Sequence, residues 1–544
     1  MSSTLSSTLS RRGFLGLALA GVTVAGLAAC GGEGGTAGVK KGGAELSKKL
    51  ALPTFTAAKI PAPDLPTDAG QDPAYLKYPS ELVKSVAAPP GDGKKITSLT
   101  QTWDVAPPAP GENTYLQELS KALGSEWSMN IVVGDGYPDK FNAIVASDNL
   151  PDLVWFPPNQ GLQRVPELLE AKFHDLTPYL SGDAIKKYPN LANLGDLTWK
   201  SAVTNGKIFG VAVAYSRFGQ IFLVNQDYWE PVGGVGFASA DDFLEKAKQL
   251  LDVGKNKYPL EPSYYNHVHM FSHWYGAPNT WRLAGGKLTH QFETPEYQAA
   301  LELAVKCFKA KLFWPDPSLA TIQDKVANGQ IGAFVESFPG FVNLARTQKY
   351  KLGAIVPFAA TPSSKPVYNA GLGSVGFTSI SKKVDPKRIE TLLGVLNYMA
   401  APFGTEEYQL VNFGVAGTHF TKKDGDLTLT DKGRAEVPTT LQPISFVIGS
   451  PSALFLPGQP EHTKLIHDFE TKVAPMLQQR VTTGHFSDTY TQKNGELSTM
   501  GSDMVVDIVT GRKPLSDWPA FVKKWLSRGG EAMRAEYEAS IAKG

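Results

Sequence analysis

The chain has 544 residues, of which 53 are basic and 52 acidic, so its formal net charge at pH 7 is only +1. This balance provides no basic surface for nucleic acid, and we expect no nucleic-acid partner. At roughly 150 residues per domain, the length predicts about two to four domains. The hydrophobic fraction of 42% suits a buried globular core.

The N-terminal thirty residues have the three-part layout of a bacterial export signal, with a basic region, an apolar stretch and small residues before Cys30. Arg11 and Arg12 lie in a segment that resembles the twin-arginine motif, so export by this route or by the general route is predicted. Leu27–Cys30 resembles a lipobox, which implies that Cys30 is the lipid-modified first residue of the mature chain. A transmembrane anchor is the alternative, but the apolar run is short and rich in glycine.

The predicted mature protein is therefore extracytoplasmic and is anchored to the bacterial cell membrane through the lipid on Cys30. Cys307 is the only other cysteine, so no disulfide is expected. Residues 31–95 are rich in Gly, Pro and Ala and are predicted to form a tether followed by an extended segment. The apolar pair Tyr75 and Tyr78 suggests that the later part of this segment docks on the body.

From Ile96 the sequence pattern alternates between strands and helices. Strands are predicted at 96–103, 127–133 and 151–156, with helices at 113–123 and 137–147 between them. This order implies a mainly parallel sheet. Ligands of such sheets gather at the carboxyl ends of the strands. The candidate ligand contacts at these ends are Trp103, Asp104, Trp155 and Phe156.

The strand-like segment 206–229 is predicted to carry the chain into a second lobe, and it contributes Tyr215 and Arg217 as candidates close to both lobes. Helices are predicted after the cap residue Ser239 and at 294–313 and 386–401. The amphipathic C-terminal segment is predicted to pack in the core.

Few catalytic signatures are present. Gly371–Gly376 fits the GxGxxG pattern, but it precedes a strand-like segment and does not open a helix, so we interpret it as a hinge loop and expect no cofactor. Nucleophile-elbow, zinc-protease and phosphate-loop motifs are missing from the sequence. A carbohydrate-active enzyme remains an alternative, because two acids facing each other across a cleft cannot be recognised in a sequence.

The stretch from Asn266 to Trp281 combines three histidines with asparagines and tryptophans. His269 and His273 are four residues apart and would share one helical face, as a metal pair requires, whereas His267 would point elsewhere. A metal-binding receptor built on these three histidines is a second alternative, although no nearby side chain completes a set of four ligands. Trp274, Asn279 and Trp281 could instead line a sugar site.

Several segments resemble the extracellular solute-binding proteins of bacterial ABC importers, in the large lipoprotein branch that handles oligosaccharides. The resemblance is carried, in order, by residues 151–156, 172–180, 206–216, 222–233, 275–301, 328–340, 412–420 and 507–525. It implies an α/β fold of the two-lobed periplasmic-binding-protein type, similar to maltose-binding proteins, with a mainly parallel sheet flanked by helices in each lobe and a multi-strand hinge. Both lobes are expected to be discontinuous: 96–222 plus 375–440, and 223–374 plus 441–544.

This resemblance implies a non-enzymatic, monomeric, substrate-binding component of an ABC transporter. It would capture a carbohydrate, expected to be an oligosaccharide, between two closing lobes and deliver it to the transmembrane permease subunits. Relatives in this family often have an arginine at the position of Asn225, and the absence of this arginine weakens the case for an acidic sugar.

A sugar site combines flat aromatic rings, which cover the C–H faces of pyranoses, with planar polar groups that meet the hydroxyls. The resemblance adds Glu336 and Phe338 in a return element that faces the cleft, and His419 and Phe420 in the segment 412–420. The complete set of predicted ligand contacts is Trp103, Asp104, Trp155, Phe156, Tyr215, Arg217, Trp274, Asn279, Trp281, Glu336, Phe338, His419 and Phe420. Within it, Trp281 is the preferred stacking residue, with Asn279 beside it.

Overall fold

The computed structural model describes residues 50–102, 106–158, 162, 164–316, 319–337, 341, 344–345, 348–437, 443–485 and 487–542. The predictions for Arg11, Arg12 and Cys30, and those for Trp103, Asp104 and Phe338, lie outside these residues. Across the described ranges, no helix is both long enough and apolar enough to cross a membrane.

The first sheet contains the strands predicted near the start of the body. Its five strands are, in spatial order, β2 (Trp127–Val133), β1 (Ile96–Thr102), β3 (Leu153–Phe156), β14 (Ser374–Ile380) and β6 (Val211–Ala214). The strands β2, β1 and β3 pair in parallel, whereas β14 runs antiparallel to both of its neighbours. The prediction of a mainly parallel sheet therefore holds for strand direction, but the pairing is mixed because β14 returns from the second half of the body.

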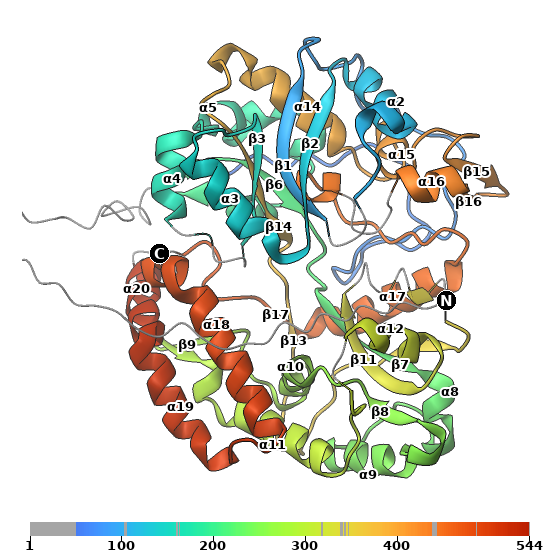
Figure 1. Cartoon of the computed structure of the whole chain (residues 1–544), viewed down its shortest axis with the longest axis vertical. Coiled ribbons are helices and arrows are strands. Elements are labelled where there is room, and N and C mark those ends of the chain that lie inside the picture. Colours follow the sequence, from blue (N-terminus) through green and yellow to red (C-terminus); the bar gives the residue numbers. More distant parts are fainter. Residues whose placement is uncertain are drawn as a thin grey trace, which may run out of the picture. The chain divides into compact units, whose positions relative to one another are not determined.

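Helices flank the first sheet and bury its apolar side chains (Figure 1). They include α2 (Thr114–Leu123), α3 (Tyr137–Ala146), α4 (Val165–Lys172), α5 (Thr177–Leu180), α6 (Pro189–Ala192), α7 (Asp196–Lys200), α14 (Ile389–Met399) and α15 (Glu406–Phe413). The helix α2 begins after Asn113, whose side chain accepts a hydrogen bond from the backbone N–H of Leu116, and it ends at Gly124 in the left-handed conformation. We call the buried cluster formed here the first core; it also includes Ile444, Val447 and Ile448.

The second sheet is smaller and is likewise mixed. Its strands are, in spatial order, β12 (Leu352–Ala354), β7 (Gln220–Asn225), β11 (Ile331–Ser337) and β8 (Tyr258–Leu260). Here β7 runs antiparallel to both neighbours, while β11 and β8 are parallel. In each sheet, the strand that runs opposite to the others, β14 or β7, comes directly after the chain has crossed over from the other sheet.

A second buried cluster, which we call the second core, is formed mainly by side chains of helices. These helices include the three C-terminal ones shown in red in Figure 1. These helices are α8 (Gln226–Trp229), α9 (Ala240–Leu250), α10 (Tyr264–Tyr275), α11 (Pro295–Lys309), α18 (Asp488–Val509), α19 (Trp518–Trp525) and α20 (Glu531–Ala542). As predicted, Ser239 caps α9 by accepting a hydrogen bond from the N–H of Asp242. The amphipathic C-terminal segment packs in this core through Trp518, Trp525 and Tyr537.

Three passages connect the two cores. The first joins β6 to β7, and the second leads from β13 (Tyr368–Asn369) to β14. The third runs from the first core at Ile448 to α17 (Pro460–Val473). Beside these passages β13 pairs in parallel with β17 (Leu477–Gln478).

Shorter elements complete the described structure. They are β4 (Val203–Thr204), β5 (Lys207–Ile208), β9 (Trp281–Ala284), β10 (Lys287–His290), α12 (Leu319–Ala327), β15 (Phe420–Lys423), β16 (Asp426–Leu429) and α16 (Asp431–Glu436).

Residues 50–95, which we call the N-terminal strap, contain no helix or extended strand, and every one of them is described. The strap is nevertheless fixed along its length. The N–H of Thr54 donates to the carbonyl of Gly182, and the N–H of Gly91 donates to the carbonyl of Leu123. Between these points Tyr75 and Tyr78 enter an aromatic cluster.

Candidate functional site

A cavity of about 570 Å³ is lined by side chains from both cores. This volume falls within the range of small-molecule sites in proteins. Its described lining includes Leu50, Leu52, Phe156, Leu162, Lys200, Thr204, Trp281, Leu372, Gly376, Phe377, Arg480, Thr482, Thr483, His485, Tyr490, Thr491, Asn494 and Tyr537. No Asp or Glu occurs among the lining residues that the structure describes.

The first-core wall of the cavity is built where β3 ends. Phe156, the last residue of β3, stacks on Phe377 of β14 with ring centroids 5.2 Å apart and planes 6° apart. The strands approach so closely here that a Cβ on Gly376 would lie 2.1 Å from the carbonyl oxygen of Phe156, and Gly376 also has a φ of +110°. Only glycine fits this position. The GxGxxG segment therefore leads from the second passage into a strand, with its last glycine at the cavity.

The second-core wall contains Trp281, the first residue of β9. Its indole ring is only 3% exposed, because it packs against His290, with centroids 4.8 Å apart, and near Tyr537. The guanidinium of Arg534 lies 6.0 Å from the ring centroid. Trp281 thus borders the cavity, although most of its ring surface is covered by protein.

The turn after β17 and the first part of α18 provide the polar part of the lining: Arg480, Thr482, Thr483, His485, Tyr490, Thr491 and Asn494. Asn279 holds β17 in place. Its backbone N–H donates to the Gln478 side chain at 2.8 Å, and its Nδ2 donates to the carbonyls of Gln478 at 2.8 Å and Ala370 at 2.9 Å. Asn279, predicted as a ligand contact, therefore has its amide N–H groups directed to backbone carbonyls, and it positions the turn that carries Arg480.

Two predicted tryptophans are enclosed by the cores. Trp274 is 1% exposed and lies between Phe243, Phe358 and Phe222. Trp155 is also buried, and its indole N–H donates to the carbonyl of Val375 at 2.9 Å. Neither residue belongs to the cavity lining.

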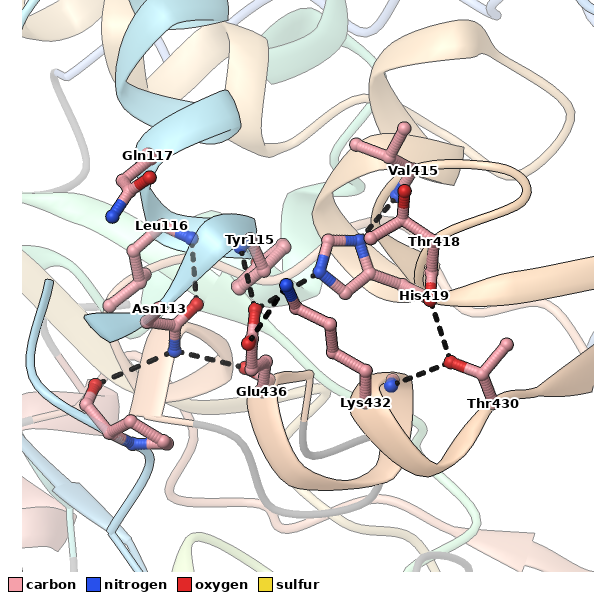
Figure 2. Close-up of polar contacts among 12 residues, drawn as sticks. Asn113, Tyr115, Leu116, Gln117, Val415, Thr418, His419, Thr430, Lys432 and Glu436 are labelled. Carbon is pink, nitrogen blue, oxygen red and sulfur yellow. Dashed lines mark hydrogen bonds and ion pairs between the residues drawn. The ribbon is translucent and has the colours of Figure 1, made fainter. Parts of the chain in front are cut away.

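His419 lies in a buried polar network, shown in Figure 2. Phe420 is also buried, but it packs in the aromatic cluster that contains Tyr75 and Tyr78. The N–H of Val415 donates to Nδ1 of His419 at 3.0 Å, so Nε2 carries the proton and faces Glu436 Oε2 at 3.2 Å. Glu436 also accepts from the N–H of Tyr115 at the start of α2, 3.2 Å away. His419 connects two chain segments here and does not line the cavity.

Tyr215, Arg217 and Glu336 lie at or near the first passage and not in the cavity lining. Burial and the nearby Glu336 carboxylate raise the pKa of Tyr215 to about 12. Arg217 donates to the carbonyl oxygen of Gly70 in the strap. Of the predicted ligand contacts that the structure describes, Phe156 and Trp281 line the cavity. The others lie near the first passage or are enclosed in the protein interior.

Two histidines of α10, His267 and His273, are buried, and His269 is half-buried. His269 and His273 share a face as predicted, with ring centroids 4.8 Å apart. Burial lowers the pKa of His267 and of His269 to about 4, and it lowers the pKa of His273 well below its usual range. Within the described ranges, no three His, Cys, Asp or Glu side chains gather as a metal site would require.

Arg480, Tyr490 and Tyr537 line the cavity but were not predicted as contacts. Arg480 follows a two-residue strand, which leaves no alternating pattern in the sequence. Tyr537 was predicted as a core residue of the C-terminal helices, and it is indeed buried there while bordering the cavity. Only the folding of α18 and α20 back to β9 brings these side chains to one place.

Two mixed sheets flanked by helices, three passages between two cores and a shared cavity define the fold of the two-lobed solute-binding proteins, as the sequence resemblance predicted. A solute-binding protein of Bifidobacterium longum infantis, described as HMO binding and associated with an ABC transporter, superposes with a TM-score of 0.62 at 14% identity, covering 83% of this chain and 99% of that structure. The predicted fold class is confirmed.

No family model matches the chain. Among characterised proteins it is similar to the polygalacturonan/rhamnogalacturonan-binding protein YtcQ of Bacillus subtilis, with 23% identity over 477 residues, or 84% of this chain and 92% of YtcQ. It is also similar to the lipoprotein LipO of the same organism, with 23% identity covering 81% of this chain and 91% of LipO.

Proposed function

We propose that this protein is the substrate-binding component of an ABC transporter that captures a carbohydrate between two lobes and delivers it to a membrane permease. The lobes are built on the first and second cores. The observation that carries the proposal is the cavity lined from both cores, which combines aromatic rings with half-buried polar groups. The names of the relatives, which refer to carbohydrate binding and to a lipoprotein, support it.

The chemistry of the cavity favours binding over catalysis. A glycosidase uses two carboxyl groups placed roughly 5–10 Å apart across the sugar. The described lining offers hydroxyl, amide, guanidinium and aromatic groups but no carboxyl group. Such groups can hold a sugar reversibly, as a transport receptor requires.

The test is thermal unfolding of the protein with a panel of oligosaccharides and, separately, with divalent metals. A specific carbohydrate at 100 times its dissociation constant should stabilise the fold by about 2.7 kcal/mol. Tyr490→Ala, which removes a half-buried ring of the cavity, should weaken binding roughly tenfold because a stacking surface is lost. Tyr350→Ala, outside the cavity lining, is the matched control. Stabilisation by a metal and by no carbohydrate would contradict the proposal.

We further propose that lipid on Cys30 anchors the protein to the cell membrane. Cys30→Ser should move the protein from the membrane fraction to the soluble extracytoplasmic fraction, because a single thioether-linked lipid group would be the attachment. Cys307→Ser is the control, since Cys307 is buried and burial raises the pKa of its thiol to about 12. Continued membrane association of the Cys30→Ser variant would reject this mode of anchoring.

A further inference from the structure

Arg480 lies in the turn that follows β17 and lines the cavity. Its side chain is half-buried. The groups that interact electrostatically with it include Tyr265, His269 and Tyr537, all of which are uncharged at neutral pH. The guanidinium is thus partly removed from water, and these three neighbours carry no negative charge.

The other described arginines have an oxygen partner. Their partners are Glu167 for Arg164, the Gly70 carbonyl for Arg217, Glu296 for Arg282, Asp92 for Arg388, Asp431 for Arg434, Asp507 for Arg512, Glu496 for Arg528 and Glu293 for Arg534. Arg480 alone, in the described part of the chain, has neither an ion pair nor a side-chain hydrogen bond. A partly desolvated cation without a partner is unfavourable, so the place of Arg480 in the cavity wall is explained if an anion from the ligand pairs with it.

A second cation approaches the same turn from the first core. Lys200, the last residue of α7, has its Cδ 3.8 Å from the position that a Cβ on Gly484 would occupy. Its side chain is exposed and forms no ion pair with any described residue. Lys200 and Arg480 both line the cavity, so two positive charges from different cores face one volume.

The carboxylate of Glu536 in α20 is engaged by donors at the start of α18. Glu536 accepts hydrogen bonds from the hydroxyl of Ser487 at 2.5 Å and from the backbone N–H and hydroxyl of Thr489 at 3.0 and 2.8 Å. It therefore stabilises the N-terminus of α18. Neither Glu536 nor Asp488 belongs to the described lining.

Asn225 stands where relatives often have an arginine, which in the sequence weakens the case for an acidic sugar. In the structure this residue lies away from the cavity lining. It is 4% exposed and caps α8 by accepting a hydrogen bond from the N–H of Tyr228 at 3.1 Å. It does not line the cavity. The identity of residue 225 therefore does not affect whether the ligand is acidic.

We propose that the ligand is an anionic oligosaccharide with a uronate unit, whose carboxylate binds Arg480 while Lys200 adds charge from the opposite core. This inference rests on the proposed carbohydrate-binding function and specifies its substrate class. The guanidinium fork matches a carboxylate with two parallel hydrogen bonds. The hydroxyls of Thr482, Thr483 and Tyr490 line the same cavity and suit the hydroxyls of the sugar.

The test compares uronate trisaccharides (galacturonate, glucuronate and mannuronate) with their methyl esters and with neutral trisaccharides, by calorimetric titration of the full chain in mild detergent. We expect at least one uronate to bind ten or more times more tightly than its methyl ester, and this preference to shrink as salt is raised. Arg480→Gln should abolish the preference for the acid over the ester, whereas Arg480→Lys should retain part of it. Arg434→Gln, which removes an exposed arginine remote from the lining, should leave it unchanged.

The outcomes separate this inference from the proposed function. If only neutral sugars bind, or if acid and ester bind equally, the anionic class is rejected while carbohydrate binding stands. If Arg480→Gln keeps the full preference, the assignment to Arg480 is rejected. If no carbohydrate of either class binds, both proposals fail.

Discussion

Glu261 carries a carboxyl group that is buried in the fold. Its Oε1 accepts a hydrogen bond from the N–H of Val335 at 2.7 Å. Burial raises its pKa to about 8, and the nearby Glu336 contributes to the rise. Near neutral pH the folded protein therefore holds a proton at Glu261 that the unfolded chain releases.

This residue gives the fold a specific dependence on pH. Because the pKa is raised in the folded state, its contribution to stability is fully present below the unfolded value of 4.5 and is lost as the pH rises through about 8. Glu261→Gln, which keeps the acceptor for Val335, should remove this decline, worth a few kcal/mol in total. Chemical denaturation at several pH values between 5 and 8 measures it.

Two histidines of α10 provide the internal comparison. His267 and His269 have a lowered pKa, so their contribution is present above the unfolded value of 6.5 and is lost as the pH falls toward about 4. This acid-side loss should be the same in the parent and in Glu261→Gln. Equal slopes of the two proteins on the alkaline side would contradict the assignment to Glu261.

At the scale of elements, the N-terminal strap is attached to the passages between the cores through Asp72. The Asp72 Oδ2 atom accepts hydrogen bonds from Ser216 Oγ in the first passage at 2.8 Å and from Ser452 Oγ in the third passage at 2.5 Å. The N–H of Asp72 donates to Glu470 of α17 at 2.9 Å. One strap residue thus holds two passages and a helix of the second half.

Asp72→Ala should lower the free energy of unfolding by about 2 kcal/mol, because two side-chain hydrogen bonds of about 1 kcal/mol each are lost. Glu81→Ala, at an exposed position of the same strap, should change it by less than about 0.5 kcal/mol. Denaturant unfolding followed by tryptophan fluorescence measures both. Similar effects of the two substitutions would show that the strap does not depend on Asp72.

The elements also show which parts of the site a sequence can predict. The buried apolar run of β3 predicts both the strand and its carboxyl end, and the last residue of this strand, Phe156, lines the cavity. The helix α10 was rich in sugar-binding residue types, but Trp274 turned inward because a helix buried on several faces has no single functional side. Arg480 was missed because its position depends on a pairing of two-residue strands from distant parts of the chain.

For the molecule as a whole, the order of strands and helices predicts an α/β fold with mainly parallel strands, whereas the two-lobed fold class comes from the resemblance to solute-binding proteins. Pairing was harder to predict. The sequences of β14 and β7 have the same apolar pattern as other buried strands, so they do not show that these two strands run in the opposite direction. Their direction follows from the passages between the cores. Those passages are short and carry no periodic pattern of their own.

Because both cores line the cavity, we expect ligand binding to bring the two lobes closer together. A ligand shifts such an equilibrium only by its difference in affinity for the two states. Contacts to Phe156 and Lys200 on one side and to Arg480 and Tyr490 on the other can all form only when the two walls are close. To change the ratio of closed to open protein from 1:99 to 99:1, the ligand must bind the closed state more favourably than the open state by about 5.5 kcal/mol.

We therefore expect the radius of gyration in solution scattering to fall when a saturating carbohydrate is added. Tyr490→Ala should need a higher ligand concentration for the same decrease, since it removes contacts from one wall only. Tyr350→Ala, outside the lining, should follow the parent protein. Binding proved by calorimetry without any change in scattering would mean that the lobes are already closed before ligand arrives, and that the cavity recognises its ligand as a preformed site.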